Sequence, residues 1–206
     1  MSESTDTAHT DHPLIWDASI DAMLAGWCDE AKCFEWMHTE AYSMFETKAR
    51  RIAITSAILS AVAGLSNVIA GNKDINGFQL SWIFGAISIG VSLTNMLQEK
   101  LAYNSRAAEH RAYAIQWGNI RRKIEEQVGI PWSGRKDCGT FLKYLRQDLD
   151  SASKDGNIRI PHKIRDACNT RFGKIPNFDV PDICGDMSHT KVYMATAPLL
   201  GGGGSM

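Results

Sequence analysis

Two long stretches without a charged residue constrain this chain more than any other feature. The first runs from Ile52 to Asn72 and the second from Ile75 to Gln98, and only Lys73 and Asp74 lie between them. As a helix with a rise of 1.5 Å per residue, residues 52–70 would extend for roughly 29 Å, which is about the thickness of the bilayer core. We therefore predict two transmembrane helices, at residues 52–72 and 77–98.

The alternative is a buried helical hairpin inside a water-soluble protein. A buried helix of this length normally carries charge somewhere on its perimeter, and a chain of 206 residues offers little protein to cover two such helices. The turn between the runs is short and contains Gly71, Asn72, Asn76 and Gly77. A turn of this length makes the two helices antiparallel neighbours, so the sequence favours a transmembrane hairpin.

Positive charges flank the two runs unevenly. Three lie just before the first run and three follow the second, whereas the turn holds one: Lys48, Arg50 and Arg51, then Lys100, Arg106 and Arg111, against Lys73. Cytoplasmic segments carry the excess of Lys and Arg. We therefore expect a multi-pass membrane protein with two spans and both termini on the cytoplasmic side. Residues 1–12 do not resemble a signal peptide, so the first span itself would direct insertion.

Helical periodicity continues on both sides of the hairpin. Before it, apolar residues recur at steps of three or four: Trp16, Ile20, Met23, Leu24, Trp27, Ala31, Phe34, Met37, Ala41 and Phe45. After it, a looser stripe comprises Leu97, Leu101, Ala108, Tyr113, Trp117, Ile120, Ile124 and Val128, with Ile115 off it. The pattern ends at residues 129–131, Gly-Ile-Pro. We expect the second helix to continue through this stripe, and the two stripes to pack together as an antiparallel pair.

These patterns divide the chain into three parts. Residues 1–13 are polar and predicted to be disordered, residues 14–130 form the two-transmembrane helical domain, and residues 131–206 form a C-terminal extension. The extension is predicted to contain a helix capped by Thr140 and a second one from Pro161 to about Arg171, stopped by Gly173. Residues 154–157 are expected to form a turn. The tail from Lys174 is expected to be irregular and to need another molecule for its order. The predicted class is an all-α membrane protein.

The candidate functional residues of the spans are small or polar. Small residues spaced four apart let helices approach closely in lipid, and they occur in both spans: Ser56, Ser60 and Gly64, then Ser81 with Gly85, and Ala86 with Gly90. They could pack within the hairpin or between subunits, and we expect a homo-oligomer in either case. Asn67 and Asn95 are the most polar groups in the spans and lie near opposite ends, so each should bond locally or across a subunit boundary, or line a pore.

The residues outside the spans that are of catalytic or metal-binding type do not form the pattern of an active site or a metal site. Cys28, Cys33 and His38 are spaced by five, which rotates successive side chains about 140° around a helix and prevents convergence on a metal. His110 and Glu109 lack a nucleophile placed by the sequence. We predict no enzyme, no metal and no cofactor. The net charge of −1 gives no reason to expect nucleic acid as a partner.

Two further groups have plain interpretations. The five cysteines are odd in number and match no disulfide framework, so we expect reduced thiols. Residues 121–123, Arg-Arg-Lys, could touch anionic lipid headgroups, but Glu125 and Glu126 follow closely and favour a solvated helix face.

Several segments resemble the SLATT domain, a two-transmembrane helical family. They are residues 33–38 (Cys-Phe-Glu-Trp-Met-His), residues 48–51 (Lys-Ala-Arg-Arg), and residues 58–60 through 64–67 (Gly-Leu-Ser-Asn). The resemblance covers about residues 24–130. It implies a helix before and a long helix after the hairpin, and versions of the domain are common among large DNA viruses of eukaryotes. No sensor or nucleotide-making domain accompanies it here.

The resemblance leaves two functional hypotheses. The first is a non-enzymatic virion protein of an internal membrane, a minor capsid component whose residues 131–206 contact capsid proteins. The second is a pore-forming membrane effector, as this family is thought to supply in bacteria. In both, the partners are the lipid bilayer and further copies of the chain.

Overall fold

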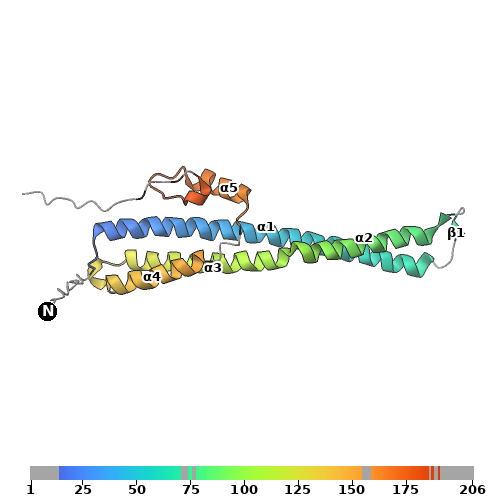
Figure 1. Ribbon diagram of the computed structural model, residues 1–206, viewed down its shortest axis with the longest axis horizontal. Coiled ribbons are helices and arrows are strands. Elements are labelled where there is room, and N and C mark those ends of the chain that lie inside the picture. The colour runs from blue at the N-terminus through green and yellow to red at the C-terminus, as the bar shows by residue number, and fades with distance from the viewer. Residues whose placement is uncertain are drawn as a thin grey trace, which may run out of the picture.

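The computed structural model describes residues 14–70, 74–75, 78–154, 159–185, 187 and 190. The described chain is almost entirely helical (Figure 1), in agreement with the predicted all-α class. In chain order the elements are α1 (Ala18–Ala70), β1 (Asp74–Ile75), β2 (Phe78–Gln79), α2 (Leu80–Leu101), α3 (Tyr103–Val128), η1 (Trp132–Gly134), α4 (Cys138–Ser153), α5 (His162–Phe172) and η2 (Asp182–Cys184).

One helix, α1, runs through most of the length of the molecule. Its 53 residues correspond to about 80 Å at 1.5 Å per residue. The predicted amphipathic helix and the first uncharged run are therefore a single continuous helix. Its first half packs against α3 and its second half against α2, so the chain divides into two regions. We call residues 14–51 with the described residues from Tyr103 onward the head, and the rest of α1 with α2 the stalk.

The head contains two hydrophobic cores. The first lies between the start of α1, the end of α3 and α4, and includes Leu24, Ile124 and Leu145. The second lies between the middle of α1, the start of α3, α5 and η2, and includes Met37 and Cys168. Every residue of the predicted stripe from Trp16 to Phe45 is buried or half-buried. The predicted antiparallel packing of the helices before and after the hairpin is confirmed.

The prediction that the second helix continues unbroken past Leu101 is wrong. Ala102 adopts a left-handed conformation, with φ 46° and ψ 37°, and separates α2 from α3. The break changes the phase of the buried face. The residues on this face are Leu101 before the break and Tyr103 and Ala107 after it. The predicted stripe residue Ala108 is exposed. A continuous helix would have turned Ser105 toward α1 in their place, because neighbouring positions on one face lie three or four residues apart.

The hairpin turn and the C-terminal extension also differ in part from expectation. The second helix begins at Leu80 and not at residue 77, because Asp74 and Ile75 pair antiparallel with Gln79 and Phe78. The helix predicted to be capped by Thr140 begins at Cys138, because the Asp137 side chain accepts a hydrogen bond from the Thr140 backbone N–H at 2.8 Å.

The C-terminal extension contains the second helix that was predicted for it and also a short 3-10 helix that was not. The predicted helix after Pro161 is confirmed as α5, with Gly173 as its C-cap. The tail is not irregular throughout, because η2 contacts α5 and places Cys184 in the second core. The predicted disordered residues 1–13, most of the turn at 154–157 and residues 191–206 lie outside the described residues.

A buried arginine fixes the end of the head that is farthest from the stalk. The Arg135 side chain is 4% exposed, forms an ion pair with Asp21 and stacks over the Trp16 ring at 4.9 Å. It also donates hydrogen bonds to the Val128 and Ile130 carbonyl oxygens. The hydrogen bond from Arg135 holds the pKa of Asp21 below its usual value. These contacts connect the segment after α3 to the first turn of α1.

Candidate functional site

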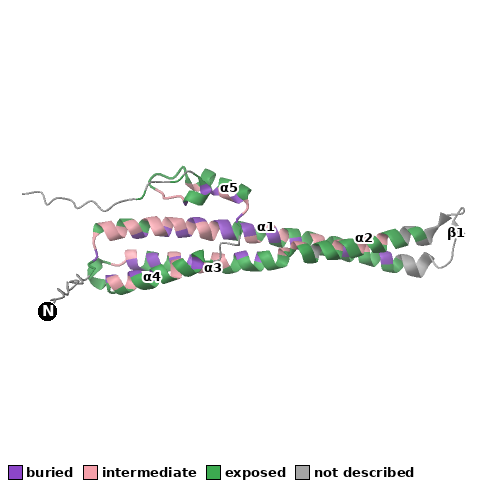
Figure 2. Ribbon diagram, viewed as in Figure 1, coloured by how far each residue is buried: buried purple, intermediate pink, exposed green. Residues whose placement is uncertain are grey.

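The stalk exposes large apolar side chains on both of its helices. Figure 2 shows buried residues concentrated in the head, whereas the stalk is mostly exposed. On α1 the exposed residues are Ile54, Ile58, Val62 and Leu65, and on α2 they are Trp82, Ile89, Leu93, Met96 and Leu97. An apolar surface of this extent is uncommon on a monomer in water and marks contact with a membrane or a partner.

The seam between the two stalk helices is formed by only part of their surface. Among the described side chains of α1 in the stalk, the buried positions are Ser56 and Ala63. Ser56 Oγ donates a hydrogen bond of 2.7 Å to Asn95 Oδ1 on α2. The expectation that Asn95 bonds locally or to another subunit is therefore corrected, because its partner is on the neighbouring helix of the same hairpin. The Asn67 side chain lies outside the described residues.

Most of the predicted small residues do not lie in this seam. Ser60, Gly64, Gly85 and Ala86 are exposed. A Cβ atom added at Gly64, Gly85 or Gly90 would meet no neighbouring atom within 4 Å. Of the two alternatives for these residues, packing within the hairpin therefore applies to Ser56, while the exposed ones remain available to another copy of the chain. The side chain of Ser81 lies outside the described residues.

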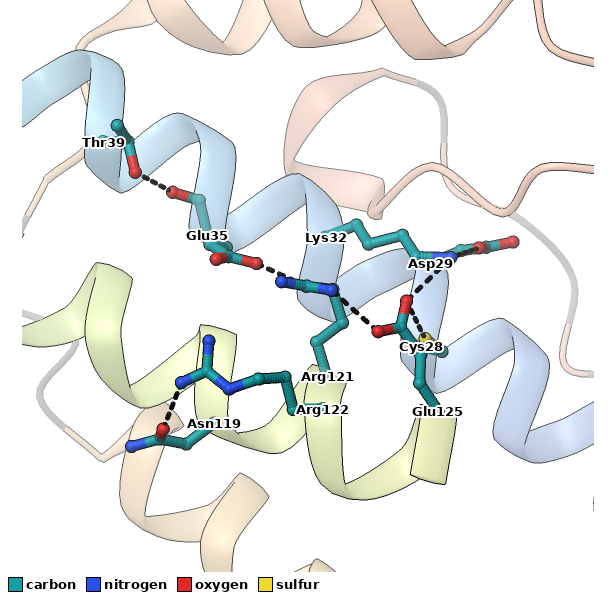
Figure 3. A network of polar contacts seen from close by, with 9 residues as sticks. All are labelled: Cys28, Asp29, Lys32, Glu35, Thr39, Asn119, Arg121, Arg122 and Glu125. Carbon is teal, nitrogen blue, oxygen red and sulfur yellow. Dashed lines mark hydrogen bonds and ion pairs between the residues drawn. The ribbon is translucent and has the colours of Figure 1, made fainter. Parts of the chain in front are cut away.

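A network of charged side chains joins α1 to α3 in the head (Figure 3). Arg121 Nε lies 2.6 Å from Glu35 Oε2, and its Nη1 lies 2.7 Å from Glu125 Oε2. Lys32 completes the network with contacts to Asp29 and Glu125. The prediction of a solvated face is confirmed for Arg122 and Lys123, which are exposed. It is wrong for Arg121, whose guanidinium bridges the two helices.

A close approach of the two helices accompanies this network. A Cβ at Gly118, a buried residue of α3, would lie 2.7 Å from the Glu35 carboxylate. Glycine at this position therefore leaves room for the carboxylate of Glu35 beside Arg121. The network fixes the register of α1 against α3, and partly exposed ion pairs of this kind contribute roughly 0.2–1 kcal/mol each.

Two buried histidines face each other in the contact between α1 and α3. The Nδ1 atoms of His38 and His110 are 2.9 Å apart, so one ring donates a hydrogen bond and the other accepts it. Tyr113 stacks on His38 and Phe45 stacks on His110. Burial lowers the pKa of His38 to about 4 and also lowers the pKa of His110. Both imidazoles are therefore neutral at pH 7.

The residues considered for metal binding or acid–base chemistry have separate partners. Cys28 Sγ lies 4.0 Å from Glu125, Cys33 is in the second core, and His38 contacts His110. The Glu109 carboxylate accepts a hydrogen bond from Ser105, on the exposed side of α3. The pairing of His38 with His110 was not predicted, although each histidine interrupts the apolar face of its helix, which is the signal that could have indicated it.

Three buried thiols meet in the second core. Cys33, Cys168 and Cys184 come from α1, α5 and η2, and Cys184 Sγ donates to Met37 Sδ at 3.3 Å. The hydrogen bond with Cys168 and burial raise the pKa of Cys184 well above its usual value. All five cysteines are free and buried. These thiols pack as small apolar side chains.

Among the residues that the structure describes, no helix combines the length and the apolar character needed to cross a membrane. Comparison with protein-family models, with curated proteins and with solved structures finds no match to this chain.

Proposed function

We propose that the chain is a non-enzymatic integral membrane protein in which the stalk is a two-helix transmembrane hairpin. The observation that carries this proposal is the surface of the stalk, where large apolar side chains such as Ile58 and Leu93 are exposed. The sequence has no charge from Ile52 to Asn72 or from Ile75 to Gln98. Lipid would cover this surface, which would otherwise be in contact with water.

The ends of the stalk support an orientation with the head on the cytoplasmic side. Five exposed cations lie where the stalk meets the head: Lys48, Arg50, Arg51, Lys100 and Arg106. Lys48 also lies over the rings of Phe45 and Tyr103 at that level. Trp82, which is 76% exposed, lies near the opposite end. Cations at the cytoplasmic boundary and tryptophan at an interface are typical of a membrane span.

If the stalk anchors the chain in a membrane, the head is the part that binds other proteins. In this proposal the protein belongs to the internal membrane of a virion, as a minor capsid component, and the head with residues 131–206 contacts capsid proteins. The resemblance of residues 24–130 to the SLATT domain, versions of which are common among large DNA viruses, favours a viral membrane. The division of the chain into an apolar stalk and a water-exposed head supports a link between a membrane and a protein layer.

A pore-forming effector is the second candidate. The observation that favours it is the outward position of Ser60, Gly64, Gly85 and Ala86, which lie outside the seam of the hairpin. Small residues exposed to lipid allow further copies of the hairpin to pack closely against them. A ring of such hairpins, with their hydroxyl groups turned inward, could enclose a polar path.

The first experiment separates membrane insertion from peripheral binding. Membranes containing the full chain are washed with alkaline carbonate, and an integral protein stays in the pellet. Complete release of the chain into the supernatant would reject the proposal in both forms. The protein that is retained is then reconstituted in liposomes that contain a small fluorescent dye.

Dye release separates the two candidates. Release that increases with protein concentration and is lost in Gly64→Leu and Gly85→Leu supports the pore. It should persist in Val62→Leu, which enlarges an exposed side chain about 160° around α1 from Gly64. Stable insertion without release supports the anchor, which also requires the protein to be present in purified particles at stoichiometric copy number. Absence from such particles would reject the virion assignment.

A further inference from the structure

A cavity of about 520 Å³ lies in the head where five elements meet. Its walls come from α1, α3, the end of α4, residues 159–160 with the α5 helix that follows them, and η2. The lining residues are Phe34, His38, Tyr113, Trp117, Ala152, Ser153, Arg159, Ile160, Arg165 and Ile183. This volume falls within the range of small-molecule sites, which is roughly 300–1,000 Å³.

One side of the cavity is aromatic. The rings of Phe34 and Trp117 stack at a centroid distance of 4.6 Å with an interplanar angle of 16°. His38 and Tyr113 form a second stacked pair at 5.4 Å. These four rings belong to the contact between α1 and α3. Flat rings of this kind favour a flat apolar body.

The other side of the cavity is positively charged. Arg159 is exposed to solvent and Arg165 is half-buried, and both line the cavity. The Nε atom of Arg165 is buried and has no hydrogen-bond partner among the described atoms. No carboxylate belongs to the described residues that line the cavity. A buried guanidinium donor without a partner is costly, and an anionic acceptor would satisfy it.

From this arrangement we infer that the cavity binds a small organic anion, in which a carboxylate or phosphate group is joined to a flat apolar body. The anionic group would accept hydrogen bonds from Arg165 and Arg159, and the flat body would lie against Phe34 and Trp117. Ser153 adds a hydroxyl group at the end of α4. The site lies wholly in the head, so the inference does not depend on where the stalk is located.

The experiment uses three probes with the same flat body: 1-naphthyl phosphate, 1-naphthoate and the uncharged 1-naphthamide. Each is titrated calorimetrically into the purified full chain, with a blank titration into the same detergent. We expect saturable binding of one site per chain for at least one anion. The uncharged probe should bind at least tenfold more weakly. The stronger of the two anions identifies the group as phosphate or carboxylate.

Two variants connect this binding to the cavity. Arg165→Gln should weaken binding of the anion by tenfold or more, because it removes the charged donor. Lys163→Gln removes an equal charge from an exposed position of the same helix and should leave affinity unchanged. An equal loss of affinity in both variants would mean that the anion is attracted only by the overall positive charge, and would overturn the inference. Failure of both anions to bind at millimolar concentration would overturn it as well.

Folding of the variants is checked independently of ligand. Far-ultraviolet circular dichroism and the thermal midpoint of Arg165→Gln without ligand should match those of the parent chain to within a few degrees. If this variant does not fold, Arg165→Lys replaces it. Since a lysine cannot reproduce the planar donor set of Arg, affinity should still fall, and unchanged affinity would reject the assigned role of Arg165.

Discussion

The head and the stalk share one long helix, α1, but differ in whether its apolar side chains are covered by protein. In the head, α1 buries Leu24, Met37 and Ala41 completely against neighbouring elements. In the stalk, the same helix has one neighbour, α2, and leaves Ile54 and Ile58 exposed. The head therefore stabilises itself by covering its apolar side chains, whereas those of the stalk need lipid or another protein molecule to cover them. A helix can be continuous in backbone and change its environment partway along.

The largest expected effect comes from a charge placed in the stalk. Ile58 in the stalk and Ile115 in the head are equally exposed, at 59% and 56%. If the stalk lies in lipid, Ile58→Asp should oppose insertion by about 4 kcal/mol, whereas Ile115→Asp in water should change stability by about 0.5 kcal/mol or less. The carbonate-resistant fraction of each variant measures this difference. Equal, small effects at both positions would mean that the stalk is in contact with water.

The second prediction concerns truncation of side chains. Ile124 is fully buried in the first core of the head, and Ile89 is exposed on α2. Ile124→Ala should destabilise the head by about 3 to 4 kcal/mol, because it removes buried contacts and leaves a cavity. Ile89→Ala should change unfolding by about 0.5 kcal/mol or less. Chemical denaturation followed by near-ultraviolet circular dichroism compares the two. Similar losses would show that the stalk is packed like the head.

The third prediction is a pH dependence confined to the head. The folded pKa of His38 is about 4, below its value of 6.5 in the unfolded chain, so the unfolded state binds more protons between these values. Stability should therefore be full above pH 6.5 and fall as the pH drops to about 4, by up to about 3 kcal/mol. Phe34 and Tyr113 stack on His38 and Phe45 stacks on His110, and none of these rings supplies a negative charge. The charge of Glu109 acts to raise the pKa of His110, but burial outweighs it and the net shift is downward.

A variant isolates this contribution. His38→Asn keeps a side-chain hydrogen-bonding group near the position of Nδ1 and removes the titrating ring. The loss of stability between pH 6.5 and 4 should become smaller in this variant. If urea denaturation gives the same pH dependence for the variant and the parent chain, the histidine pair is not its source.

The smallest expected effect is at the boundary between the two regions. Ala102 holds a left-handed conformation that costs an L-residue about 1–2 kcal/mol, and glycine adopts it readily. Ala102→Gly should therefore stabilise the chain by about 1 kcal/mol. Ala112→Gly, at an exposed and regular position of α3, should destabilise it by a similar amount. Two substitutions with the same sign would contradict the left-handed break.

The parts of the fold that follow from local periodicity were predictable from the sequence. The stripe from Trp16 to Phe45, the end of α3 at Val128 and the stop of α5 at Gly173 are set by residues close in the chain. The left-handed residue at Ala102 was not, because alanine is the residue that least suggests a break in a helix. Its reason is tertiary, since α2 and α3 must both turn their apolar faces toward α1.

The candidate site was only partly accessible from sequence for a related reason. The spacing of the small residues in the stalk could be recognised in the sequence. Whether they point outward depends on which face of α1 packs against α2, and the sequence does not give that face. The His38–His110 pair and the Arg165 cavity bring together residues from separate helices, and neither follows a local motif. The cap at Asp137 could have been found, because Asp three residues before Thr140 is a common start of a helix.

Protection from a protease shows directly whether the stalk spans a bilayer. Sealed vesicles with the cytoplasmic face outward are treated with proteinase K, and the fragments that stay with the membrane are identified by mass spectrometry. If the stalk is a transmembrane hairpin, the head is digested and one protected fragment remains that contains residues 52–98 with Lys73 intact. Digestion of that segment in sealed vesicles, or its release from the membrane, would show that the stalk does not span the bilayer.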